Sequence, residues 1–283
     1  MQDFHNKVAV ITGGASGIGR ALAEQCVQEG ATVVLADIEE SALAETAQAL
    51  TEQGGTVLPV RTDVSQPAEI EQLAQQTLQT FGAVHLLFNT AGVTGFGAGG
   101  SVWKSKTADW EWVLGVNLWG VIHSLRTFVP IMLAQESEGY IVNTASMAGL
   151  ISGEPSASYQ VSKHAVVALS ENLYHSLARQ HAKLKTAVLC PGWVNTRALD
   201  SERNRPSPLR VERQMRPEQA ALMQTLQQRL ANGLPPSQVA SQVFAAMRAG
   251  QFYILTHPEL KELVRQRMED ILLERNPTLL DIL

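Results

Sequence analysis

One glycine-rich stretch decides how this chain folds: Thr12-Gly13-Gly14-Ala15-Ser16-Gly17-Ile18-Gly19. It lies between an apolar, β-branched run typical of a buried strand (8–12) and a helical pattern (18–29). A glycine turn between a strand and a helix lets backbone N–H groups approach a phosphate, and the helix N-terminus adds partial positive charge. The alternative is a turn that merely needs glycines. A P-loop is disfavoured because Arg20 follows the last glycine where a P-loop has Lys.

The rest of the chain repeats this alternation of strand and helix. Further strand-like runs cover 32–37, 57–60, 84–88, 140–143, 184–189 and 252–255. Helical patterns cover 41–53, 67–81, 108–134, 158–180, 235–248 and 259–274. Strands that alternate with helices of this length imply βαβ crossovers and a parallel sheet that is buried on both faces. We therefore predict one α/β domain over 1–283, a Rossmann-type doubly wound parallel sheet of about seven strands with helices on both faces.

Two segments do not fit this alternation. Residues 197–218 are rich in Arg, Pro and Ser and show little periodicity, which predicts a loop or a small helical insertion. We interpret 197–235 as a substrate-binding loop or lid that is inserted into the domain. The glycine-rich run 95–100 predicts a second loop, near the mouth of the site.

The composition limits the partners that the protein can have. The chain of 283 residues carries a formal net charge of −5, so it offers no basic footprint for nucleic acid or for an anionic membrane. Its first seven residues are too polar for a signal peptide, and the apolar run after them is far shorter than the roughly 20 residues of a membrane helix. The two cysteines and seven histidines show no metal-ligand spacing. We expect a soluble, cytoplasmic protein that binds no metal, nucleic acid or membrane.

Asp37 ends the second strand-like run, about 20 residues beyond the glycine turn. A carboxylate at this point can accept hydrogen bonds from the hydroxyls of an adenosine ribose, and it repels a 2′-phosphate. Neither Ser16 nor Ile38 supplies a positive charge that would attract such a phosphate. The pattern therefore favours NAD over NADP. The alternative is that Asp37 only caps the helix that follows.

Three further residues indicate proton chemistry. Tyr159 and Lys163 are four residues apart on a predicted helix and share one face, and Ser146 follows strand 140–143 at the edge where such sheets bind ligands. A free tyrosine has a pKa near about 10 and is a poor base at neutral pH, but an adjacent ammonium favours the phenolate. A Tyr-x-x-x-Lys pair alone is more often a solvated helix face. It gains weight here from the glycine turn, Asp37 and Ser146, and the absence of a Gly-x-Ser-x-Gly elbow argues against a serine hydrolase.

Taken in order, these motifs resemble the short-chain dehydrogenase/reductase family from residue 7 to about residue 196. The glycine-rich stretch resembles the family's cofactor motif, and Asp63-Val64 resembles its adenine-contacting pair. Asn89-Thr90-Ala91-Gly92 resembles its Asn-Asn-Ala-Gly motif, with Thr90 in place of the second Asn. The catalytic tetrad of the family is matched by Asn117, Ser146, Tyr159 and Lys163. The segment that holds the nicotinamide amide is matched by Pro191-Gly192-Trp193-Val194-Asn195-Thr196.

The resemblance implies an NAD(P)-dependent oxidoreductase that acts on CH–OH groups. Ser146 would orient the substrate oxygen and Tyr159 would exchange the proton with it. Lys163 would lower the Tyr159 pKa and bind the nicotinamide ribose, while Asn117 would hold a water in a proton relay. The implied cofactor-binding residues are Gly13, Ser16, Gly17, Ile18, Gly19, Asp37, Asp63, Val64, Asn89, Ala91, Gly92, Tyr159, Lys163, Pro191, Gly192, Val194 and Thr196. The family likeness also implies a homodimer or homotetramer in which the helices over 108–134 and 155–180 pair between subunits.

The candidate substrate pocket is mainly apolar. Its predicted members are Met147, Ala148, Gly149, Leu150, Glu154, Trp193 and the segment 197–225. This composition predicts an apolar secondary alcohol or ketone as the substrate. The preference for NAD, which Asp37 indicates, favours oxidation of the alcohol. Two alternatives stay open: an NADPH-dependent ketone reductase, and a nucleotide-binding scaffold or redox sensor without enzymatic activity.

Overall fold

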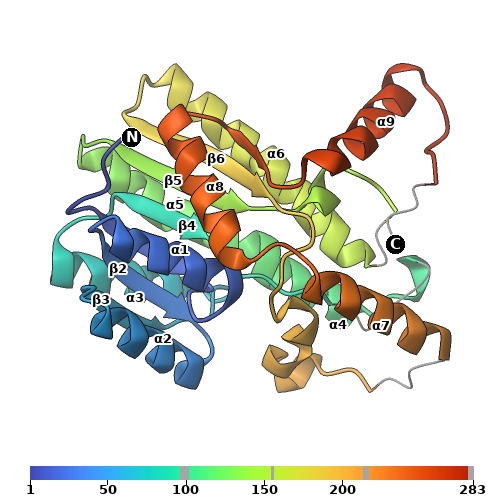
Figure 1. The fold of residues 1–283 in the computed structure, drawn as a ribbon, viewed down its shortest axis with the longest axis horizontal. Helices are drawn as coiled ribbons and strands as arrows, with labels where there is room; N and C mark the ends of the chain where they lie inside the picture. Colours follow the sequence, from blue (N-terminus) through green and yellow to red (C-terminus); the bar gives the residue numbers. More distant parts are fainter. Residues whose placement is uncertain (96–101, 154–155, 213–216, 280–283) are drawn as a thin grey trace.

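The protein is built around a parallel sheet of seven strands (Figure 1). The computed structural model describes residues 1–95, 102–153, 156–212 and 217–279. The strands are β1 (Val8–Thr12), β2 (Thr32–Asp37), β3 (Val57–Arg61), β4 (Leu86–Asn89), β5 (Gly139–Thr144), β6 (Leu184–Cys190) and β7 (Tyr253–Leu255). Their order is β3-β2-β1-β4-β5-β6-β7, so the direction of winding reverses between β1 and β4. Such a reversal opens a crevice at the carboxyl ends of the strands, where α/β folds bind ligands.

Helices cover both faces of the sheet. They are α1 (Gly17–Gln28), α2 (Glu40–Glu52), α3 (Pro67–Phe81), α4 (Thr107–Leu114), α5 (Gly120–Ala134), α6 (Ala157–Arg179), α7 (Pro217–Ala231), α8 (Pro236–Ala249) and α9 (Lys261–Leu272). Helices α1, α2 and α8 share one apolar core with the sheet, and α1 and α8 cross the front of the sheet in Figure 1. Helices α3, α5 and α6 share the second core on the opposite face. Alternate residues of β1, such as Val10 and Ile11, belong to different cores, which explains why the strand is apolar throughout.

The predicted doubly wound α/β fold is confirmed, with three local differences. Strand β4 begins at Leu86 instead of residue 84, because the backbone N–H of Val84 donates to the side chain of Gln135 at 2.8 Å. The predicted helix over 108–134 contains a π-helical turn at Gly115–Trp119 between α4 and α5. Helix α7 lies inside the segment 197–235 that we predicted as a lid, and it begins at the end of 197–218, where a loop or a small helical insertion was expected.

The glycine-rich run predicted as a loop at 95–100 lies outside the described residues except for Gly95. Among the residues that the structure describes, the stretch Thr107–Ala134 is long and apolar enough to cross a membrane by length and composition alone. Its residues Val121, Leu125 and Phe128 are buried in the core that α5 shares with α3, α6 and the sheet. A helix buried in a soluble protein passes the same test, so this stretch is weak support for a membrane location.

Candidate active site

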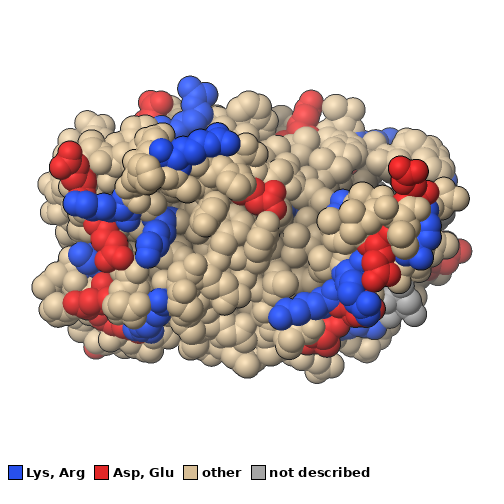
Figure 2. Space-filling model, turned by 90° about the horizontal axis from the view of Figure 1, so that it is seen from above, with Lys and Arg blue, Asp and Glu red and all other residues tan. Residues whose placement is uncertain are grey.

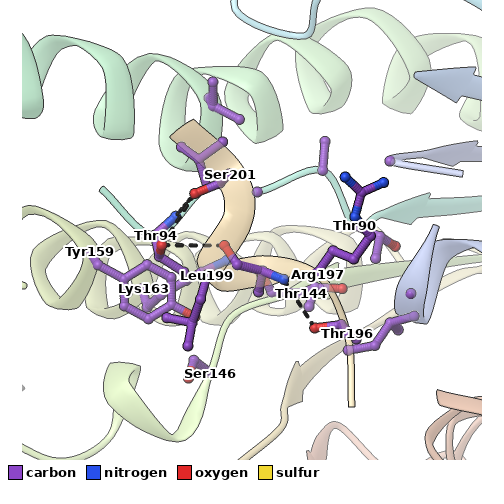
Figure 3. A pocket seen from close by; sticks show the side chains of 18 of the residues that line it. Thr90, Thr94, Thr144, Ser146, Tyr159, Lys163, Thr196, Arg197, Leu199 and Ser201 are labelled. Atoms are coloured by element: carbon purple, nitrogen blue, oxygen red, sulfur yellow. Dashed lines mark hydrogen bonds between the residues drawn. The ribbon is translucent and has the colours of Figure 1, made fainter. Parts of the chain in front are cut away.

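A cavity of about 790 Å³ lies at the carboxyl edge of the sheet and brings most of the predicted site residues together (Figure 3). Its walls follow five neighbouring strands, because Gly13, Asp37, Ala91, Ser146 and Pro191 each lie at or just after the end of a strand. The predicted catalytic and cofactor-binding residues among its lining are Gly13, Ser16, Gly17, Ile18, Gly19, Asp37, Asp63, Val64, Ala91, Gly92, Ser146, Tyr159, Lys163, Pro191, Gly192, Val194 and Thr196. The predicted substrate-pocket residues Met147, Ala148 and Trp193 line it as well. The order of strands in the sheet therefore gathers motifs that are far apart in sequence.

The turn after β1 is shaped so that only glycine fits at its contact points. Gly13 has a φ of +67°, and a Cβ on it would lie 2.8 Å from the backbone of Ala91. A Cβ on Gly19 would lie 2.1 Å from the carbonyl oxygen of Gly13, so α1 approaches the turn closely. The backbone is thereby exposed to the cavity beside the N-terminus of α1, where phosphate oxygens are favoured. This cradle fits the pyrophosphate of a dinucleotide cofactor.

Asp37 is fixed in place at the end of β2. Its carboxylate accepts hydrogen bonds from the backbone N–H groups of Ala15 at 3.0 Å and Glu39 at 3.1 Å. Burial raises the pKa of Asp37 above its ordinary value, against the lowering effect of these N–H groups. Glu39 lies beside it and binds Arg203 at 2.5 Å, and this pairing lowers the pKa of Glu39. Two carboxylates thus define this end of the cavity.

The three residues with proton chemistry come from two elements. Tyr159 and Lys163 project from the first turns of α6, and the Lys163 ammonium lies 5.6 Å from the centre of the Tyr159 ring. Figure 3 shows both beside Ser146, which begins the short helical turn after β5. Lys163 is buried and donates to the carbonyl oxygen of Thr144 at 3.0 Å. This arrangement puts a phenol, a hydroxyl and an ammonium around one small volume, which suits proton transfer to a substrate oxygen.

The π-helical turn places Asn117 behind this group. Its side chain accepts from the backbone N–H of Val93 at 2.8 Å and donates to the Val93 carbonyl at 2.9 Å. It also donates to Ser162 at 3.0 Å, and the Ser162 hydroxyl in turn donates to the carbonyl of Tyr159 at 2.6 Å. A π-helical turn inside an α-helix frequently marks a functional site. Asn117 therefore ties the loop after β4 to the helix that carries Tyr159, and its relay role stays a prediction.

We expect a Lys163→Met variant to be more stable than the wild type at neutral pH. Burial lowers the pKa of Lys163 from its ordinary value to about 8, so the folded protein is penalised wherever this lysine is charged. The penalty, on the order of 3 kcal/mol, is fully present below pH 8 and disappears as the pH rises toward the unfolded value. Urea unfolding of both proteins at pH 7 and pH 10 checks this: the advantage of the variant should shrink at pH 10. An equal advantage at both pH values would contradict it.

A short helical turn, η5 (Ala198–Asn204), lines the cavity at the start of the segment that we predicted as a lid. Thr94 holds it in place, since its backbone N–H donates to Ser201 at 3.2 Å and its hydroxyl donates to the carbonyl of Ala198 at 3.3 Å (Figure 3). Beyond η5, Arg205 is fully buried and pairs with Asp109 of α4 at 2.5 Å. The start of the predicted lid is thus anchored on both sides of the site.

Some predicted residues lie outside the cavity. Asn89 is buried in the sheet, where its amide donates to Asn143 at 2.8 Å and joins β4 to β5. Asn117 is buried behind the cavity wall. Gly149 and Leu150 do not line it either, because Gly149 packs against the backbone of Lys163 and Leu150 packs on the core. Glu154 lies outside the described residues.

Other lining residues were missed by the sequence reasoning. Thr94, Trp112, Ile151, Leu260 and Leu263 line the cavity, and they come from elements outside the motifs. Their apolar or small polar character is no different from that of core residues, so the sequence carries no signal for them. Among the described residues, no group of three or more His, Cys, Asp or Glu side chains is arranged to hold a metal ion.

Comparison with known proteins agrees with this geometry. The family model for short chain dehydrogenases matches residues 7–207. The chain belongs to the short-chain dehydrogenase/reductase family. It is 49% identical to a short-chain dehydrogenase/reductase from Burkholderia phymatum crystallised with NAD, with a TM-score of 0.94 over 98% of both chains. It is 34% identical over 280 residues to a CLA biosynthesis dehydrogenase/reductase of Lactiplantibacillus plantarum, covering 98% of this chain and 97% of the relative.

A third relative is named as a dehydrogenase. The C alpha-dehydrogenase of Sphingobium sp. is 30% identical over 274 residues, which cover 96% of this chain and 87% of the relative. This short-chain dehydrogenase/reductase is therefore an oxidoreductase that acts on CH–OH groups with a nicotinamide cofactor. The predicted family, enzyme class and cofactor class are confirmed.

Proposed function

We propose that this enzyme is an NAD-dependent dehydrogenase that oxidises an apolar secondary alcohol to a ketone. The observation that carries the proposal is a single cavity in which the glycine cradle and Asp37 lie at one end and Ser146, Tyr159 and Lys163 at the other. A dinucleotide bound along this cavity would bring its nicotinamide to the three proton-handling groups. Reduction of NAD by secondary alcohols tests the proposal.

The chain's own residues handle the proton and the position of the substrate. Bound NAD supplies the hydride acceptor. Ser146 donates a hydrogen bond to the substrate oxygen and fixes its distance from Tyr159. The phenolate of Tyr159 takes the proton of the substrate hydroxyl, and the nearby Lys163 ammonium favours that phenolate. Electrostatic stabilisation of the phenolate together with general base catalysis accounts for the role of this pair.

The charges at the adenosine end support NAD over NADP. Asp37 repels a 2′-phosphate. The two arginines that line this part of the cavity are already paired: Arg203 binds Glu39 at 2.5 Å and Arg197 binds Asp200 at 2.7 Å. The relative from Burkholderia phymatum was crystallised with NAD, which favours the same cofactor here. The NADPH-dependent ketone reductase is the second candidate.

We expect Asp37→Asn to weaken the preference for NAD. The amide keeps an acceptor for the N–H of Ala15 but removes the charge that repels a 2′-phosphate. The ratio of kcat/KM for NADP to that for NAD should rise about tenfold or more. Steady-state kinetics with both cofactors measures it, and Glu40→Gln, on the exposed first turn of α2, is the matched control. An unchanged ratio would remove Asp37 from the account of cofactor choice.

The substrate end of the cavity is mainly apolar. It is lined by Trp112, Met147, Ile151, Trp193, Leu199, Leu209, Leu230, Leu260 and Leu263. Apolar walls of this kind bind ligands by removing their apolar surface from water, and the few polar groups fix orientation. The lining therefore supports a substrate with a sizeable apolar body around the carbinol carbon.

We also propose that the enzyme is a cytoplasmic homodimer or homotetramer. Large side chains on the helical stretches expected to pair between subunits are half exposed, among them Trp119 and Val161. On the face shown in Figure 2, charged side chains gather toward the two ends, and few of them lie in the middle. Sedimentation of the purified protein tests the assembly, and a monomer at all concentrations would contradict it.

A further inference from the structure

His257 lies directly behind the segment proposed to hold the nicotinamide. Strands β6 and β7 are parallel, and Cys190 pairs with Leu255 where both strands end. Two residues further along each chain, Gly192 and His257 meet side by side, at the carboxyl edge of the sheet. A Cβ on Gly192 would lie 2.8 Å from the imidazole ring, so the ring packs flat against this glycine. The histidine itself is buried.

The hydrogen bonds of the imidazole fix its tautomer. The backbone N–H of Gly192 can only donate, so Nδ1, at 3.1 Å, is an acceptor without a hydrogen. The Thr256 hydroxyl, at 2.7 Å from Nδ1, must donate to it as well. The hydrogen is then on Nε2, which donates to the carbonyl of Trp193 at 3.0 Å. One neutral ring therefore holds a backbone donor and a backbone acceptor on two successive residues of the segment.

This segment is also connected to the catalytic serine. The carbonyl oxygen of Pro191 accepts from the backbone N–H of Met147 at 2.9 Å and from the Ser146 hydroxyl at 3.4 Å. A shift of Gly192 would therefore move Pro191 and disturb the support of Ser146. The outer side of the segment is held by Leu234, whose N–H donates to Trp193 at 2.9 Å. The Trp193 carbonyl therefore accepts from two donors, His257 and Leu234, and keeps one of them if His257 is replaced. The N–H of Gly192 donates to His257 and depends on this ring.

We infer that His257 is a positioning residue. It holds the backbone of Pro191–Thr196 in the position in which this segment can bind the nicotinamide. The inference rests on the proposed function and on the family resemblance, which implies that this segment holds the nicotinamide end of NAD. His257 acts through Gly192 and Trp193. It would matter little for the adenosine end of the cofactor, which binds at β1 and β2 on the far side of the cavity.

The test compares NAD with ADP-ribose, which has the same adenosine and pyrophosphate but no nicotinamide. Three variants remove different hydrogen bonds to the segment. His257→Leu removes the bonds to Gly192 and to Trp193. His257→Asn keeps an acceptor in the place of Nδ1, and His257→Gln keeps a donor in the place of Nε2. We expect His257→Leu to weaken NAD binding about tenfold and to lower kcat about tenfold, with ADP-ribose binding changed less than about twofold. His257→Asn should be nearest to wild type, because the N–H of Gly192 depends most on this ring.

His85 offers a matched control. Its Nδ1 also accepts from a backbone N–H, that of Val8, at 3.1 Å, but it lies at the amino edge of the sheet away from the cavity. His85→Leu should leave the ratio of NAD to ADP-ribose affinity unchanged. Equal weakening of both ligands by His257→Leu, or no effect of this variant, would overturn the inference. If the wild-type enzyme binds NAD and ADP-ribose but oxidises no alcohol, the proposed function is wrong, and the binding comparison still decides the role of His257. If it binds neither NAD nor ADP-ribose, the proposed function and the role of His257 are both wrong.

Discussion

Tyr159→Phe is expected to lower kcat by about a thousandfold, within the range measured when general acid–base catalysts are removed. The substitution removes one oxygen and keeps the ring that lies 5.6 Å from the Lys163 ammonium. The substrate hydroxyl then lacks its base, because Ser146 is a poor base and Lys163, with a pKa of about 8, is mostly protonated at pH 7. Turnover of the best alcohol with NAD, measured beside the Kd for NAD, checks this, and the Kd should change little.

A tyrosine on the same helix provides the control for this variant. Tyr174 is half exposed and packs edge-on against Phe252, with ring centres 5.1 Å apart. Tyr174→Phe keeps that contact and should leave kcat within about twofold of wild type. If Tyr159→Phe retained a tenth or more of the wild-type kcat, Tyr159 would not be the acid/base.

Arg205→Met is expected to lower the free energy of unfolding by about 3–5 kcal/mol and to raise KM for the alcohol. The side chains of Arg205 and Asp109 are each 1% exposed, and the guanidinium also lies 4.7 Å from the centre of the Trp112 ring. Removing the arginine leaves the carboxylate of Asp109 buried without this cation. Because Trp112 lines the cavity and Arg205 follows η5, loosening this pair opens the substrate side. Urea unfolding and steady-state kinetics measure the two effects.

Two controls show whether the loss of stability in Arg205→Met comes from the buried charge of Asp109 or only from the loss of an ion pair. The double variant Arg205→Met with Asp109→Asn removes the stranded charge and should recover much of the lost stability. Arg265→Met breaks the pair with Glu262, in which the side chains are 64% and 62% exposed, and should cost less than about 1 kcal/mol. If Arg205→Met cost no more than Arg265→Met, the buried pair would not anchor the lid.

The parts of the fold that the sequence predicts are those with local signals. Strand β1 is apolar apart from its last residue and is buried along its whole length, and β2 is apolar and buried between its two ends. The glycine turn, Asp37, Ser146 and Pro191 each lie at or just after the end of a strand. Parallel order then brings Asp37, Ser146 and Pro191 to one edge without any long-range information. This is why the motifs and the cavity agree so closely.

The parts that the sequence does not predict depend on contacts between distant residues. Helix α7 was not predicted, although Leu222, Leu226 and Leu230 recur at helical spacing; only Leu226 is buried, because the helix makes few contacts with the core. The π-helical turn that places Asn117 has no sequence signature distinct from an ordinary helix. The pair of Arg205 with Asp109 joins residues 96 positions apart, and the bond of His257 to Gly192 joins residues 65 apart. Nothing in the sequence around any of these four residues indicates its partner.

The decisive measurement is the reduction of NAD by a panel of secondary alcohols, graded in size and polarity and followed by absorbance of the reduced nicotinamide. We expect turnover with NAD in preference to NADP, fastest for alcohols with a large apolar body, and a loss of about a thousandfold in Tyr159→Phe. Binding of NAD without turnover of any alcohol in the panel, and without reduction of the matching ketones by NADH or NADPH, would contradict it and favour a nucleotide-binding scaffold.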